Sequence, residues 1–229
     1  MKRIIIFTLG FLLSGIILAE QKPAPKAQKP KEPKFLKYTI QILSKGQPVQ
    51  TMTTYKSDDK YRFEVWEGEG KGKKLKIIYI QKGDAIYIIS PKEKMIMIVP
   101  RQREGMAGLG RIPNNLKVNP EWDAWVESEG KSHGVKKIKT EKWQGEVCDV
   151  YRAMNLRDKS YVDLYVERKS KMIKKWIYYD ATNKVLNEMR LLEYSVNKPI
   201  KSDKFEIPKG YQVQDMRQMP MYPAPPPPK

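Results

Sequence analysis

Hydrophobic and polar residues alternate with a period of two along most of the chain between residues 35 and 214. In the first such segment every second residue from Leu36 to Ile42 is apolar, while its neighbours Lys37 and Gln41 are polar. Successive side chains of a strand point to opposite faces, so this pattern predicts a strand with one dry and one wet face. Two more strands are expected near residues 49–56 and 61–68, after turn-like sequences.

Three further segments are apolar at both odd and even positions: 74–81, 85–90 and 94–100. Strands of this kind are covered on both sides in folded proteins. We therefore expect another layer to lie over part of the sheet.

The alternating pattern resumes in five later segments: 136–143, 145–154, 160–168, 171–179 and 184–196. The total is about eleven strands, nearly all joined by short loops, and short connections require antiparallel neighbours. The sequence thus predicts a mainly β fold, in which a curved antiparallel sheet forms an unclosed, half β-barrel.

One long connection interrupts the strands and contains the sequence NPEWDAWVESEG, residues 119–130. Asn119 is a favourable N-cap, Pro120 suits the first helical position and Gly130 suits the end of a helix. A short helix of about ten residues is marginal on its own. It must therefore be docked on the sheet.

The apolar residues of this helix, Trp122, Trp125 and Val126, are spaced i, i+3 and i+4 and so share one face. A helix laid on the concave side of a curved sheet is a lid over a cavity, and such cavities commonly bind apolar ligands. The alternative is an ordinary packed core made of the same side chains. The sequence predicts these residues as the cavity lining: Trp66, Ile78, Ile80, Tyr87, Ile89, Met95, Met97, Trp122, Trp125 and Val126.

The two ends of the chain differ from this domain in composition. Residues 1–19 have a charged start, an apolar run and a final alanine, which predicts a cleaved export signal without a lipobox cysteine, with an uncleaved anchor as the alternative because Ile17 is not a small residue. Residues 20–34 are rich in lysine and proline and read as an extended linker, and residues 215–229 read as a proline-rich, disordered tail. The folded domain is therefore expected over residues 35–214, outside the cytoplasm.

Charge and reactive residues limit the classes of function. The formal net charge is +18, which favours anionic partners such as lipid headgroups or acidic proteins, although a solvated lysine surface explains it equally well. Cys148 and His133 are the single residues of their types, and this favours a buried structural cysteine and no metal or cofactor site. The glycine-rich segment at 67–74 reads as a hairpin tip. We expect no enzymatic activity and no nucleic-acid partner.

Two segments resemble the periplasmic lipoprotein-carrier (Lol-type) superfamily. The closing SDKFEIPKGYQV matches its F-x-[IL]-P-x-G-[YF] pattern, and WQGEVCDVYRA resembles a segment in the middle of the domain. The resemblance covers most of residues 35–214. It implies an unclosed β-barrel with a helical lid that binds acyl chains or a hydrophobic client in the periplasm. The residues that match are Phe205, Ile207, Pro208, Gly210 and Tyr211 in the first segment, and Gly145, Cys148 and Tyr151 in the second.

Two functions remain open from the sequence. In the first, the chain is a monomeric carrier of a lipid or lipidated protein, held between sheet and lid. In the second, it is an envelope protein whose basic linker and proline-rich tail engage an anionic membrane surface or a protein partner, and the domain is a solid scaffold.

Overall fold

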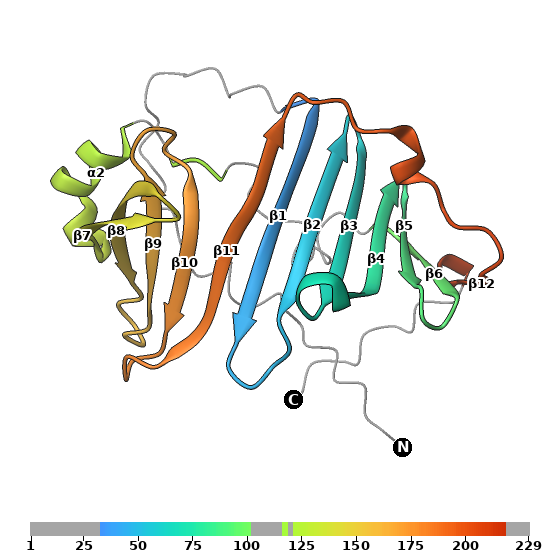
Figure 1. The fold of residues 1–229 in the computed structure, drawn as a ribbon, viewed down its shortest axis with the longest axis horizontal. Coiled ribbons are helices and arrows are strands. Elements are labelled where there is room, and N and C mark those ends of the chain that lie inside the picture. Colours follow the sequence, from blue (N-terminus) through green and yellow to red (C-terminus); the bar gives the residue numbers. More distant parts are fainter. Residues whose placement is uncertain (1–32, 102–115, 119–120, 219–229) are drawn as a thin grey trace, which may run out of the picture.

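A computed structural model describes residues 33–101, 116–118 and 121–218 of the chain. Twelve strands form one open sheet in the order β12-β6-β5-β4-β3-β2-β1-β11-β10-β9-β8-β7 (Figure 1). The fold is thus the expected mainly β, unclosed half-barrel with a short helix. The strands are β1 (Phe35–Ser44), β2 (Gln50–Ser57), β3 (Lys60–Glu67), β4 (Lys74–Lys82), β5 (Ala85–Ser90), β6 (Met95–Pro100), β7 (Val135–Trp143), β8 (Glu146–Met154), β9 (Tyr161–Glu167), β10 (Ile173–Tyr179), β11 (Val185–Val196) and β12 (Gln212–Asp215).

The sheet consists of two meanders, β1 to β6 and β7 to β11, joined by the antiparallel pairing of β1 with β11. This pairing extends from Leu36 opposite Val196 to Ser44 opposite Asn187, with one bulge. Because β1 and β11 meet in the middle, β7 forms one edge of the sheet, and β6 lies next to the other edge. Sequence pattern alone predicts the strands of each meander but not this junction.

The twelfth strand, β12, was not predicted, and it departs from the expected antiparallel arrangement. It lies parallel to β6, with Val213 opposite Ile96. Fifteen residues separate β11 from β12, enough for the crossover that a parallel neighbour requires. Its four residues include the exposed Val213, so no alternation marks it in the sequence.

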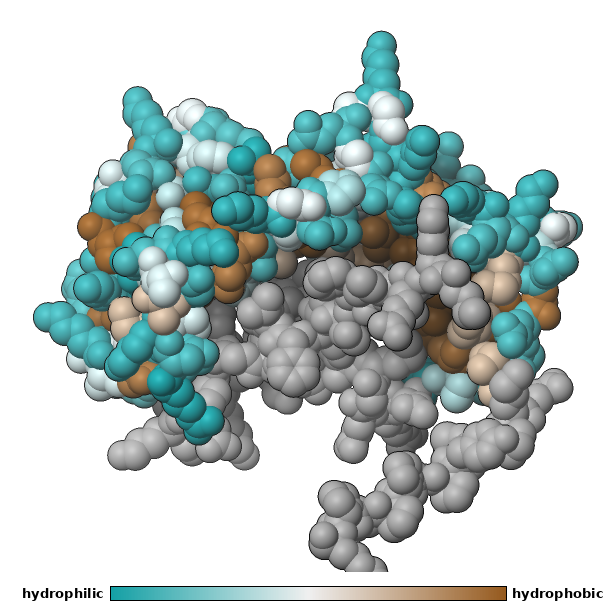
Figure 2. Space-filling model, turned by 90° about the horizontal axis from the view of Figure 1, so that it is seen from below, coloured by the Kyte–Doolittle hydropathy of each residue, from teal (hydrophilic) through white to brown (hydrophobic). Residues whose placement is uncertain are grey.

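The two sides of the sheet are named here after one residue each. The Tyr38 face carries Tyr38 with its cross-strand neighbours Thr54 and Tyr194. The Glu64 face carries Glu64 with its neighbours Thr53 and Ile78. Seen from below, the described residues form an arch with apolar side chains along its inner margin (Figure 2).

The main core lies on the Tyr38 face around the β1–β11 junction. The predicted dry face of β1 is confirmed, since the alternate residues from Leu36 to Ile42 are at most 5% exposed. They pack with side chains from the second meander and with Leu116 from the long connection. The other buried members are Val162, Met172, Trp176, Tyr178, Met189 and Leu191.

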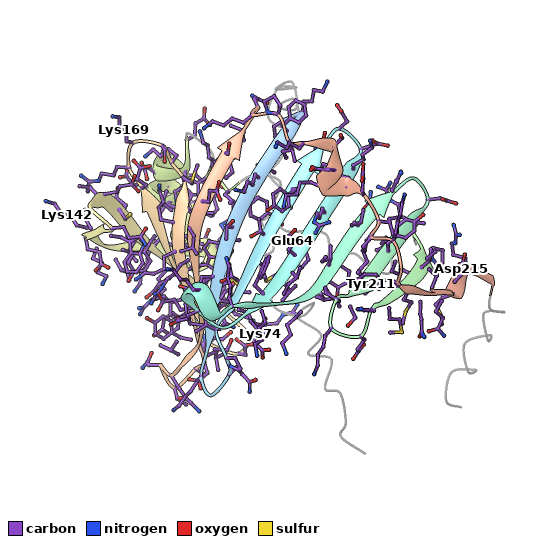
Figure 3. The ribbon with its side chains drawn as sticks, turned by 45° about the vertical axis from the view of Figure 1, so that its right-hand side comes forward. Glu64, Lys74, Lys142, Lys169, Tyr211 and Asp215 are labelled. Carbon is purple, nitrogen blue, oxygen red and sulfur yellow. The ribbon has the colours of Figure 1, made fainter. Side chains whose placement is uncertain are left out.

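A segment near the C-terminus covers one end of the Glu64 face. Ile207 and Tyr211 pack on a cluster of four buried isoleucines from β4, β5 and β6. Figure 3 shows this segment lying over those strands, with Tyr211 above the sheet and Asp215 at its edge. It covers one of the two apolar faces of these strands.

Two smaller expectations are also confirmed. Cys148 is completely buried on the Glu64 face beside Val150, Tyr165 and Ile177, as a small hydrophobic residue. The glycine-rich segment forms the tip between β3 and β4 and contains a single 3-10 turn, Gly70–Gly72.

Ile40→Ala tests the role of the β1–β11 junction. Ile40 lies between Met52 and Leu191 and is 5% exposed. Its truncation leaves a cavity, so the free energy of unfolding in urea should fall by about 3 kcal/mol. The control Val185→Ala, at a residue that is 42% exposed, should change it by less than about 0.5 kcal/mol. Equal effects at both positions would contradict the assignment of this core.

Candidate functional site

The helix of the long connection is α2 (Trp122–Ser128), and a 3-10 turn, Gly130–His133, follows it. Glu121 occupies the N-cap, so the helix starts later than the predicted cap at Asn119, which lies outside the described residues together with Pro120. Gly130 does not end the helix either, because α2 stops at Ser128. A glycine is needed at position 130 because a Cβ there would lie 2.9 Å from the carbonyl oxygen of Val135. The left-handed backbone conformation is taken by Gly134, at the end of the 3-10 turn.

The apolar face of α2 is docked on the Tyr38 face at the β7–β9 end of the sheet, as predicted for a helix with a tryptophan side. The rings of Trp122 and Trp125 lie 5.2 Å apart, and Trp122 meets Tyr151 edge-on at 5.8 Å. Val126 is buried against the same strands, in a cluster with Val135, Tyr151 and Val166. The two tryptophans therefore rest on packed side chains.

A polar contact fixes α2 at the same place. The hydroxyl of Tyr151 and the ammonium of Lys171 both donate hydrogen bonds to the carboxylate of Asp123, the latter at 2.6 Å. These bonds hold the pKa of Asp123 below its usual value, and burial and the neighbouring Asp123 carboxylate raise the pKa of Tyr151. We name this contact, Asp123 with Tyr151 and Lys171, the helix latch.

A second carboxylate, Asp149, lies beside the latch and is 4% exposed. Burial alone would raise its pKa, but hydrogen bonds from Arg168, Thr140 and Lys137 outweigh burial and hold the pKa well below the usual range. Asp149 is thus ionised and satisfied by its neighbours, which is the behaviour of a structural ion pair.

The predicted cavity lining is divided between the two faces. Ile78, Ile80 and Ile89 are at most 6% exposed within the Glu64-face cluster, with Tyr87 packed against it. On the same face Trp66 donates a hydrogen bond to Glu64. Met95 and Met97 lie on the Tyr38 face, as do Trp122, Trp125 and Val126, which pack at the other end of the sheet. The fold therefore does not bring the ten residues to one cavity wall.

Sequence reasoning missed a different set of apolar residues on strands β3 to β6. Phe63, Tyr79, Ile88 and Met97 lie opposite one another in successive strand pairs and form one row on the Tyr38 face. All four are partly exposed, and none belongs to a buried core cluster. We name these four residues the apolar row.

The signal for the apolar row was present but ambiguous. Strands β4 to β6 are apolar on both faces, and the prediction selected Ile78 and Ile80 rather than Tyr79 for the ligand side. A shift of one residue exchanges the two faces, and periodicity does not say which face is inward. The cross-strand register from Tyr38 through Thr54 and Phe63 places the apolar row on the Tyr38 face.

Other kinds of site find no support in the part of the chain that the structure describes. No group of three or more histidine, cysteine, aspartate or glutamate side chains is placed there to hold a metal ion. Within the same ranges no helix has the length and apolar character needed to cross a membrane.

Comparison with known proteins finds similarity at the level of fold. No family model and no curated protein matches the sequence. Among solved structures, an uncharacterized conserved protein from Thermus thermophilus is 10% identical, with a TM-score of 0.49, over 80% of this chain and 90% of that one. The Pseudomonas aeruginosa MucA/MucB complex gives 11% identity and a TM-score of 0.45, over 79% of this chain and 58% of the matched chain. A LolA superfamily protein from Nitrosomonas europaea gives 9% and 0.29, over 77% and 91%, so the superfamily that the sequence resembles is present among the matches.

The helix latch makes docking of α2 dependent on pH. Because the pKa of Asp123 is lower in the folded chain, its contribution to stability is present above its usual pKa and is lost as the pH falls through the folded value. Asp123→Asn should therefore lower the melting temperature by roughly 2 °C at pH 7 and by less at pH 3, which is below the usual pKa of an aspartate. Differential scanning calorimetry at the two pH values measures this.

Glu127→Gln is the matched control, because Glu127 is exposed on the same helix. It should leave the melting temperature unchanged at both pH values. A difference between Asp123→Asn and the unaltered chain that is the same at pH 3 as at pH 7 would contradict an ionic latch.

Proposed function

We propose that this chain is a non-enzymatic binding or carrier protein of the periplasm, and that the Tyr38 face holds the acyl chain of a lipid or lipidated protein. The observation that carries the proposal is the apolar row, which leaves aromatic and aliphatic side chains partly exposed on the Tyr38 face of the sheet. Exposed apolar surface of this kind, gathered on a concave wall, marks a binding site for an apolar partner.

The length of the row suits an extended hydrocarbon. The row crosses four neighbouring strands, which lie about 4.8 Å apart, so it is about 14 Å long. A fully buried methylene group contributes about 0.8 kcal/mol, and one that lies on an open surface contributes less.

The chemistry of the row also favours a partner of variable shape. Met97 is unbranched and polarisable, and the Phe63 and Tyr79 rings lie 5.8 Å apart in a tilted pair that offers both faces and edges. No polar group of the row fixes an orientation except the tyrosine hydroxyl. Such a surface discriminates by apolar area and accepts related acyl chains.

The proposed location rests on the sequence of the N-terminal end. Residues 1–19 have the pattern of an export signal, and the resemblance to lipoprotein carriers agrees with a compartment in which lipidated proteins cross between membranes. These residues lie outside the described part of the structure.

Ile88→Glu tests the acyl site. Ile88 lies in the middle of the row, and a carboxylate there would be desolvated by a bound chain. Titration of the purified protein with cis-parinaric acid, a fluorescent polyene fatty acid, should give saturable binding that the substitution weakens at least tenfold, about 1.4 kcal/mol.

Val213→Glu provides the control, since Val213 is 60% exposed on β12 and lies on the Glu64 face. Its affinity for the probe should equal that of the unaltered chain. Absence of saturable binding to the unaltered chain, or equal loss in both variants, would exclude the apolar row as the acyl site.

A further inference from the structure

The sheet is split between β10 and β11. The two strands pair only as far as Lys175 opposite Arg190. Beyond that point β11 continues to Val196, paired on one side with β1, and turns away from β10 (Figure 1). Within the described residues, nothing pairs with the second edge of β11 from residue 191 to residue 196.

The edge of β10 on the other side of the split is paired with a short extended segment of the chain. The short segment 116–118 adds to the start of β10 through an antiparallel bridge between Lys117 and Met172. The backbone N–H of Val118 donates to the carbonyl of Lys171 at 2.9 Å, and the N–H of Ile173 donates to the carbonyl of Leu116 at 2.8 Å. The segment 116–118 thus pairs with the edge of β10, while no described residue pairs with the facing edge of β11.

A cavity of about 340 Å³ occupies the split. Its floor is apolar, because Met172 and Leu191 belong to the main core and are 8% and 5% exposed. Leu192 lies at its rim as the bulged residue of β11 and is 49% exposed, although β11 is a central strand. A volume in this range is within that of ordinary ligand sites.

The rim of the cavity is acidic in a chain of net charge +18. Glu146, Glu167 and Glu193 line it together with one cation, Lys174. Lys174 lies 2.7 Å from Glu146 and 3.9 Å from Glu167, so its charge is shared between two carboxylates. The side chains of Glu146 and Glu193 remain 47% exposed although each contacts a lysine at 2.7 Å, Glu146 with Lys174 and Glu193 with Lys37, so a basic partner would share these carboxylates with surface lysines.

We propose that the free edge of β11 binds an extended segment of a partner protein as an added β-strand, with apolar side chains on Leu192 and basic side chains facing Glu146 and Glu193. An unpaired edge is a ready template for a further strand, and backbone hydrogen bonds then supply the affinity. The partner segment alternates apolar and basic side chains because the rim offers the apolar Leu192 beside the acidic Glu146 and Glu193. This inference goes beyond the acyl site and does not require it.

The probe is an acetylated, amidated five-residue peptide that alternates lysine and valine, titrated into the full chain by isothermal calorimetry. We expect saturable binding that weakens at least tenfold when the valine nitrogens are methylated, because methylation removes the backbone donors. The same peptide with glutamate in place of lysine should also bind at least tenfold more weakly.

Two variants of β11 form a matched pair. Leu192→Lys places a like charge at the split and should weaken binding of the lysine peptide at least tenfold. Leu186→Lys makes the same change at the second bulged leucine of β11, which is 40% exposed and outside the split, and should leave the affinity unchanged. Ile88→Glu should also leave it unchanged, which separates this site from the acyl site.

Hydrogen exchange of the unaltered chain tests the location without any variant. The peptide should slow exchange of backbone amides in residues 191–196 and leave residues 185–190 unaffected. The proposal is overturned by absence of binding, by protection elsewhere, by equal binding of the methylated peptide, or by protection of the edge before any peptide is added.

Discussion

The pairing of β1 with β11 holds the two meanders in one sheet, and the other features depend on it. The two strands come from opposite ends of the domain, so closing the chain between them costs configurational entropy that local turns do not recover. The buried residues on both strands, from Leu36 to Ile42 and from Met189 to Leu191, offset this cost by removing apolar surface from water. Because a slip of one residue would exchange the faces, this pairing also determines which side chains face inward.

The two faces of the sheet are completed in different ways. On the Glu64 face, Ile207 and Tyr211 cover the isoleucine cluster, and the buried Glu64 accepts hydrogen bonds from Arg62 at 2.7 Å and Trp66 at 3.2 Å. On the Tyr38 face, α2 covers the β7–β9 end, and Lys142 and Lys169 project outward beyond it (Figure 3). The β3–β6 end of the Tyr38 face has no such cover among the described residues. The binding surface that we propose is thus the part of this apolar face that the described residues leave uncovered.

Periodicity predicts what is local and fails where contacts are long-range. Eleven strands and the tryptophan face of α2 were recognised because alternation and i, i+3, i+4 spacing are properties of short segments. Strand β12 was not predicted because its four residues, which include the exposed Val213, show no alternation of apolar and polar positions. The predicted cavity lining is divided between the two faces because the register of β4 to β6 is set by strands more than twenty residues away. Both sets of side chains in β4, around Ile78 and around Tyr79, are apolar.

The split between β10 and β11 is a consequence of the same junction. β11 must follow β1 over its whole length, and it has twelve residues, whereas β10 has seven. The bulge at Leu192 keeps Leu191 and Tyr194 in register with β1, and β10 bulges near Lys174 to stay on β9. β11 stays paired with β1 and β10 stays paired with β9, and the two strands separate where both bulge. β10 therefore cannot follow β11 beyond Arg190 without leaving β9, and among the described residues the edge of β11 stays open to a partner strand.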